Sequence, residues 1–143
     1  MISDARIVVT GGAGFISSHI IERLIEKNQI VIYDNLERNS IRYSSVKDHP
    51  NLTIVEGDIL DSAKLDKCMA GADICIHAAA IAGIYTVGTK VNRTMKVNLI
   101  GIYNALESAC KNKVRRFLDF STSEIYGPFA YRSNEEGTAK IGP

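Results

Sequence analysis

Short apolar runs alternate along the chain with longer stretches in which apolar residues recur at helical spacing. The run at residues 6–10 is continuous and β-branched, which is typical of a strand buried on both faces. Four more short runs predict strands at residues 29–34, 52–56, 73–77 and 116–121. Helical periodicity predicts helices over 14–27, 61–69 and 92–111. In the last of these, we expect one face to point inward, formed by Met95, Leu99, Ile102, Tyr103 and Leu106.

Strands that alternate with helices pair in parallel through right-handed crossovers, so the predicted fold class is α/β, a doubly wound parallel sheet in three layers. Residues 127–143 differ, because they are polar and have no period. We therefore expect a domain over 1–126 and a loop tail over 127–143. The tail would lead to a missing catalytic and substrate-binding portion, so that the fold is truncated after about its fifth strand.

Three glycines lie between the first strand and the first helix, within TGGAGFI at residues 10–16. Glycine at Gly11 permits a tight turn, and the glycines after it let backbone N–H groups approach a pyrophosphate. Asp34 ends the second strand, 20 residues after Gly14. A carboxylate there accepts hydrogen bonds from an adenosine ribose 2′-OH and repels a 2′-phosphate. This combination favours NAD over NADP as cofactor, and the alternative is a purely structural glycine turn.

Charge and composition exclude several other classes. The 143 residues carry a formal net charge of +1, which gives no attraction to nucleic acid or to a membrane surface. No apolar run approaches the roughly 18 residues of a membrane span, and a strand so close to Met1 leaves no room for a signal peptide. The cysteines at 68, 75 and 110 form no metal or redox pattern. We expect a cytoplasmic protein with reduced thiols and no metal site.

Six motifs together resemble the extended short-chain dehydrogenase/reductases, and within them the NAD-dependent epimerase/dehydratase family that acts on nucleotide sugars. They are TGGAGFI at 10–16, DN at 34–35, GDI at 57–59, HAAA at 77–80, Asn98 and STSEIYG at 121–127. The resemblance implies a Rossmann-like fold with bound NAD. Ser17 departs from the family, which usually has glycine there, and we expect only a modest packing cost.

The resemblance also implies a set of cofactor-binding residues. Gly11, Gly14, Phe15 and Ile16 would line the pyrophosphate turn, and Asp34 and Asn35 would hold the adenosine ribose under Arg38 and Ser40. Asp58, beside Ile59, would accept from the adenine amino group. The wall under the nicotinamide ribose would be Ala78, Ala79, Ala80 and Ile81, although alanines there also suit plain packing. Asn98 would brace the active site.

Candidate catalytic residues follow the fifth strand, at Thr122, Ser123 and Glu124. The resemblance implies that Thr122 bonds the sugar hydroxyl undergoing oxidation and that Glu124 is a general acid/base. The similar 4,6-dehydratases carry an acidic pair at the positions of Ser123 and Glu124. Thr-Ser-Glu is therefore more similar to UDP-glucuronate decarboxylases and some sugar epimerases. A strand-end cluster that only satisfies backbone groups is the alternative.

The family's proton relay is a tyrosine with a lysine four residues later. Tyr43 and Lys47 have this spacing, but they lie in the loop after the second strand, near the adenosine end, so we do not assign them to the relay. Hydride transfer from a hydroxyl needs such a base. We therefore expect this chain alone to be inactive.

These inferences predict the NAD-binding part of a nucleotide-sugar enzyme, an epimerase, decarboxylase or dehydratase that acts through transient oxidation at C4. A UDP-sugar is the favoured substrate. Two alternatives stay open, a non-catalytic NAD-binding module and an NAD-dependent reductase of a non-sugar carbonyl. By analogy with the family, the 92–111 helix is a candidate homodimer interface.

Overall fold

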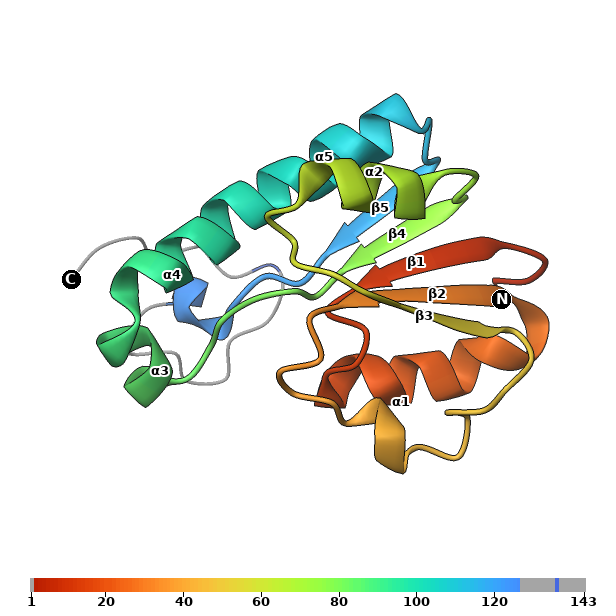
Figure 1. Cartoon of the computed structure of the whole chain (residues 1–143), viewed down its shortest axis with the longest axis horizontal. Coiled ribbons are helices and arrows are strands. Elements are labelled where there is room, and N and C mark those ends of the chain that lie inside the picture. The colour runs from red at the N-terminus through yellow and green to blue at the C-terminus, as the bar shows by residue number, and fades with distance from the viewer. Residues whose placement is uncertain (1, 127–135, 137–143) are drawn as a thin grey trace.

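The computed structural model describes residues 2–126 and 136 (Figure 1). Its strands are β1 (Arg6–Thr10), β2 (Gln29–Asp34), β3 (Leu52–Glu56), β4 (Ile74–His77) and β5 (Arg116–Asp119). Its α-helices are α1 (Phe15–Leu24), α2 (Ser62–Met69), α3 (Ile84–Thr89), α4 (Val91–Met95) and α5 (Gly101–Lys111). A π-helical turn, Lys96–Ile100, joins α4 to α5, and short 3₁₀ turns follow α1, β2 and β5. The predicted tail over 127–143 lies outside the described residues except at 136.

The described strands form one parallel sheet in the order β3-β2-β1-β4-β5. The register places Val8 of β1 opposite Val31 of β2 and Cys75 of β4. Helix α1 covers one face of the sheet, while α2 and α5 cover the other (Figure 1). The predicted Rossmann-like doubly wound fold is therefore confirmed, and α3 is the one described α-helix that periodicity did not predict.

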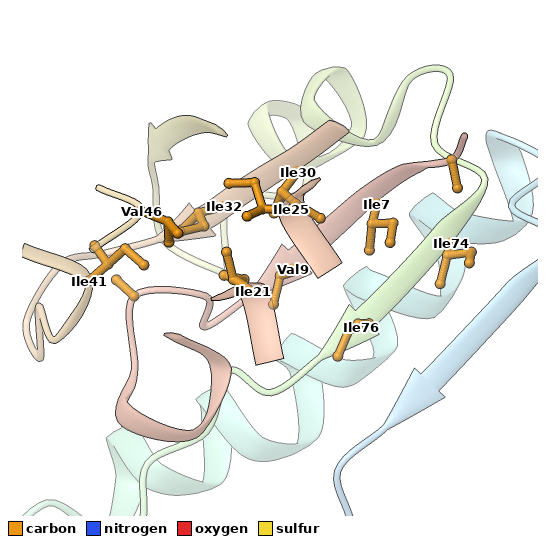
Figure 2. Packing of buried hydrophobic residues seen from close by; sticks show 12 residues of the cluster. Ile7, Val9, Ile21, Ile25, Ile30, Ile32, Ile41, Val46, Ile74 and Ile76 are labelled. Atoms are coloured by element: carbon orange, nitrogen blue, oxygen red, sulfur yellow. The ribbon is translucent and has the colours of Figure 1, made fainter. Parts of the chain in front are cut away.

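Alternate residues of the central strands fill two separate cores. Ile7, Val9, Ile30 and Ile32 point toward α1, where Ile21 packs against them (Figure 2). The intervening residues pack under α2 and α5 on the opposite face, and they include Val8, Val31, Tyr33 and Cys75. Side chains on a strand alternate between the faces of a sheet, which explains why these strands read as continuous apolar runs.

The predicted inward face of the 92–111 helix is wrong. Four of its five residues are exposed, at 54% for Met95, 58% for Leu99, 61% for Tyr103 and 42% for Leu106, and Ile102 is half-buried. The helix packs instead through smaller and polar residues, namely Val97, Gly101, Asn104, Ala105, Ser108 and Ala109. Small residues let α5 approach α2 closely, so the larger apolar side chains lie on the outer face.

Candidate functional site

The carboxyl ends of the strands meet at one edge of the sheet. From β1 the order runs to β2 and β3 on one side and to β4 and β5 on the other. Open α/β sheets bind ligands in the crevice at such a reversal, outside the carboxyl ends of the strands. The glycine turn leaves β1 at this point, so the topology places it at the centre of the edge.

Gly11 makes the turn tight and brings it against the alanine run. Its φ is +69°, and its amide donates to the Tyr33 carbonyl oxygen at 2.9 Å. A Cβ at this position would lie 2.6 Å from the amide nitrogen of Ala79 and 2.7 Å from the carbonyl of Ala78. Only glycine fits, because both the backbone conformation and the space exclude a side chain. The structure thus brings together Gly11, Ala78 and Ala79.

The first turn of α1 begins directly after this turn. Gly14 is the residue before the helix, and no side chain caps the amides there. Phe15 and Ile16 are 70% and 59% exposed, whereas Ser17 is buried at 2%. Uncapped amides at a helix N-terminus, together with the helix dipole, favour an anion. The arrangement suits the pyrophosphate assigned to it from the sequence.

Asp34 joins the end of β2 to the glycine turn. Its Oδ2 accepts from the Ala13 amide at 3.0 Å, and its Oδ1 accepts from the Leu36 amide at 2.7 Å. Burial raises the pKa of Asp34, and these two amide hydrogen bonds oppose that rise. The carboxylate therefore stabilises the shape of the turn. The sequence pattern did not predict these two hydrogen bonds. Each oxygen has a second lone pair that can accept from a ribose hydroxyl.

The loop after β2 is tied to the same turn. The Ser40 amide donates to the Ala13 carbonyl oxygen at 2.7 Å. Asn35 accepts from the Glu37 amide at 3.1 Å through its side chain, which shapes the loop. Arg38 extends further and donates to the Ala82 carbonyl oxygen at 3.5 Å. The loop therefore spans from the glycine turn to the segment after β4.

A surface pocket of about 350 Å³ lies at the ends of β2 and β3, lined by Asn35, Glu56, Gly57, Asp58 and Lys64. Asp58 accepts from the Leu60 amide at 2.9 Å and from the Arg93 guanidinium at 2.5 Å. Burial alone would raise the pKa of Asp58, but the bonds to Arg93 and Leu60 outweigh it and lower the pKa. A charged acceptor therefore faces this pocket.

Arg93 and Lys64 were not identified from the sequence. Arg93 lies 35 residues after Asp58, and no local pattern pairs them. Ile59 is buried at 6%, and its side chain packs against Gly101 of α5. Only the backbone of Ile59 can therefore contribute to a ligand site.

The Asn98 side chain holds the segment after β4 by bonding both backbone groups of one residue, Ile81. Its Oδ1 accepts from the Ile81 amide at 2.9 Å, and its Nδ2 donates to the Ile81 carbonyl oxygen at 3.0 Å. Asn98 lies in the π-helical turn, where the helix widens. This pairing fixes the backbone at Ile81.

His77 ends β4 as a structural residue. Its Nδ1 lies 2.6 Å from Thr10 Oγ1 in the interior. Burial lowers the pKa of His77, against the opposing effect of Asp119. A neutral imidazole is therefore favoured, which suits a structural role in the interior.

The candidate catalytic stretch directly follows β5. Thr122 is exposed, and a 3₁₀ turn spans Ser123–Tyr126. The side chains of Ser123 and Glu124 lie outside what the structure describes. Tyr43 and Lys47 do not share a helix, because Tyr43 ends a 3₁₀ turn and Ser44 is extended.

The described residues show neither a metal cluster nor a membrane-spanning helix. Within 2–126 and 136, no group of three or more His, Cys, Asp or Glu could hold a metal ion. No helix in this part of the chain has the length and apolar character needed to cross a membrane.

Curated relatives are similar to most of this chain over part of their own length. A UDP-N-acetyl-alpha-D-glucosaminuronate decarboxylase of Bacillus cytotoxicus is 34% identical over 123 residues, which cover 85% of this chain and 38% of the relative. A dTDP-glucose 4,6-dehydratase of Streptomyces antibioticus is 32% identical over 135 residues, covering 89% of this chain and 40% of the relative. The chain thus spans about two fifths of the length of these relatives.

Solved structures agree with the fold. A UDP-N-acetylglucosamine 4-epimerase from Methanobrevibacter ruminantium matches with a TM-score of 0.88 and 30% identity, over 98% of this chain and 45% of that one. The Bordetella bronchiseptica enzyme WbmH in complex with NAD⁺ matches with a TM-score of 0.73 and 34% identity, over 86% of this chain and 40% of that one. Residues 7–143 match the NAD dependent epimerase/dehydratase family. This chain therefore belongs to the NAD-dependent epimerase/dehydratase family.

Proposed function

We propose that this chain binds NAD along the carboxyl edge of its sheet. The observation that carries the proposal is the convergence of four features on that edge, the Gly11 turn, the uncapped start of α1, Asp34 and the pocket beside Asp58. The pyrophosphate would lie at Gly11 and Gly14, and the adenosine ribose at Asp34. A carboxylate at this position disfavours the extra phosphate of NADP by charge repulsion.

The residues present fit this cofactor. The adenine would enter the pocket of about 350 Å³, where the ionised Asp58 accepts from its amino group. The nicotinamide end would lie along Ala79, Ala80 and Ile81, on the backbone that Asn98 fixes. Small side chains suit a wall that a ring must approach closely.

We further propose that this chain is the NAD-binding part of a nucleotide-sugar enzyme, with a UDP-sugar as the favoured substrate. NAD, when bound, supplies a reversible hydride acceptor for oxidation at the sugar C4. Thr122 would hydrogen-bond the hydroxyl that is oxidised, and Glu124 would move a proton in the step that follows. The relatives named above act on UDP- and dTDP-sugars by decarboxylation, dehydration or epimerisation, according to their names.

Self-association through α4 and α5 belongs to the same proposal. Val91, Met95, Leu99 and Tyr103 recur at every fourth residue and are each more than half exposed. Together with Leu106 they form an outer apolar stripe. Stripes of this kind on a helix pair usually become covered by another chain or another segment.

A paired assay tests the proposed chemistry. Binding of NAD is measured by calorimetry, and turnover of UDP-glucuronate, UDP-glucose and dTDP-glucose is followed with NAD present. We expect binding without turnover, because Tyr43 and Lys47 are not arranged as a relay, and a general base is worth roughly 10²–10⁴-fold in rate. Turnover at rates ordinary for enzymes would contradict the expected inactivity and would require a base among the residues assigned structural roles.

A further inference from the structure

The Tyr33 side chain reaches from β2 to the loop that follows β3. Its side chain is buried at 1%, and its hydroxyl donates to the Asp58 carbonyl oxygen at 2.9 Å, with the Asp61 carbonyl oxygen 3.4 Å away. The ring lies against Gly57 so closely that a Cβ there would be 2.5 Å from it. Tyr33 therefore helps to fix the path of the chain at residues 57–61.

Asn104 holds the same loop from α5. Its Nδ2 donates to the Ile59 carbonyl oxygen at 3.0 Å, in a buried position. Gly101, one turn earlier, gives room for the Ile59 side chain, since a Cβ would be 2.8 Å from it. Two consecutive carbonyl groups are thus each held by a side chain from a different element.

These bonds also orient the neighbouring amides. A trans peptide group is planar, and its C=O and N–H point in opposite directions. Because Tyr33 holds the Asp58 carbonyl, the Ile59 N–H of that same peptide group is turned away from Tyr33. The Leu60 amide, in turn, fixes the Asp58 carboxylate at 2.9 Å. The loop therefore carries an N–H at Ile59 that is directed away from Tyr33 and, at Asp58, a charged acceptor that lines the pocket.

Resting on the proposed NAD site, we propose that Tyr33 and Asn104 are positioning residues that make the adenine pocket selective for a 6-aminopurine over a 6-oxopurine. A 6-aminopurine edge offers a donor at the amino group and an acceptor at the adjacent ring nitrogen, which complements Asp58 and the Ile59 N–H. A 6-oxopurine reverses both roles and meets the Asp58 carboxylate with an acceptor. Selectivity then depends on how rigidly the loop is held.

The test compares NAD with nicotinamide hypoxanthine dinucleotide, its 6-oxo analogue, by calorimetry. The variants are Tyr33→Phe and Asn104→Ala. The matched control is Ser108→Ala, which also removes a side-chain hydrogen bond of α5, partly buried and 2.8 Å long, to Asp66 of α2, but does not touch the loop. Since the loss of one hydrogen bond changes an equilibrium constant by about two- to tenfold, we expect either variant to reduce the preference for NAD about fivefold, and the control to leave it within about twofold.

A second measurement does not depend on ligand. The Leu60 amide donates to the Asp58 carboxylate, and the Asp61 amide donates to the Asp58 carbonyl oxygen. Hydrogen exchange of both amides should accelerate in Tyr33→Phe and stay unchanged in Ser108→Ala. Equal weakening of both dinucleotides, or unchanged exchange, overturns the role of Tyr33 while the NAD site stands. Failure of the unmodified chain to bind either dinucleotide contradicts the proposed function itself, and the selectivity inferred from it.

Discussion

The Asp34 carboxylate and the Ala13 amide are joined by a hydrogen bond of 3.0 Å, which ties the end of β2 to the glycine turn after β1. The same carboxylate accepts from Leu36 at 2.7 Å. The group assigned to the cofactor ribose is therefore also part of the scaffold that shapes the pyrophosphate turn. Cofactor binding in the proposed site and the shape of the glycine turn would therefore both depend on Asp34.

Asp34 should determine cofactor choice. Replacing it with Ser while replacing Asn35 with Arg should weaken NAD binding and admit NADP, because anion repulsion is removed and a phosphate partner is added. Calorimetric Kd values for both dinucleotides check this. Asp34→Asn is the matched control, since it removes the charge and keeps one acceptor for the Ala13 amide. Equal binding of NAD and NADP by the unmodified chain would show that this acid has been misinterpreted.

Gly11→Ala should destabilise the fold by at least about 2 kcal/mol, because a positive φ costs about 1–3 kcal/mol in a non-glycine residue and the added Cβ meets the Ala78–Ala79 backbone. Denaturant unfolding measures the loss. Gly83→Ala isolates the strain, since its φ is +101° and nothing lies within 4 Å of a Cβ there. An equal loss at Gly11 and Gly83 would mean that the contact with the alanine run carries no energetic weight.

Tyr33 should titrate at unusually high pH. Burial, followed by the charges of Asp61, Cys68 and Asp58, raises its pKa from 10.0 to about 12. A raised pKa means that folding favours the protonated phenol. The stability it contributes is therefore complete below pH 10.0 and is lost as the pH rises through about 12.

Unfolding free energies of the unmodified chain and of Tyr33→Phe, measured across this pH range, should thus converge as the pH rises. Tyr103→Phe is the control, because that hydroxyl is on a side chain 61% exposed. A difference between the unmodified chain and Tyr33→Phe that stays constant with pH would argue against the buried, hydrogen-bonded phenol.

The apolar stripe on α4 and α5 should drive self-association. Leu99→Glu, at a position 58% exposed, should shift the sedimentation profile toward monomer without loss of folding, because charge is introduced only on the outer face. Asn92→Glu adds the same side chain at an exposed polar position of α4 and should leave the profile unchanged. A monomeric unmodified chain would exclude this helix pair as a homodimer interface.

The sheet and its glycine turn could be predicted from sequence because both depend on local pattern. Continuous β-branched runs mark buried parallel strands, and Gly11 stands where the φ of +69° requires it. The outer face of α5 could not be predicted in this way. Periodicity finds the larger apolar side chains, whereas close packing on α2 selects Ala105 and Ser108, and the π-helical turn shifts the stripe.

Contacts around the pocket were beyond local pattern for a related reason. Tyr33 reaches Asp58 across 25 residues, Asn104 reaches Ile59 across 45, and Arg93 reaches Asp58 across 35. Each pair meets only because the strand order brings β2, β3 and α5 together. Sequence motifs identified Asp58 as a candidate, but the residues that orient it appear only in three dimensions.

Calorimetric titration of the unmodified chain with NAD tests the central claim most directly. The proposed site combines the Gly11 turn with the pocket beside Asp58, so the account predicts saturable binding of one NAD per chain, with NADP bound more weakly because of Asp34. Absence of saturable binding, in a sample whose fold is verified by circular dichroism, would contradict it.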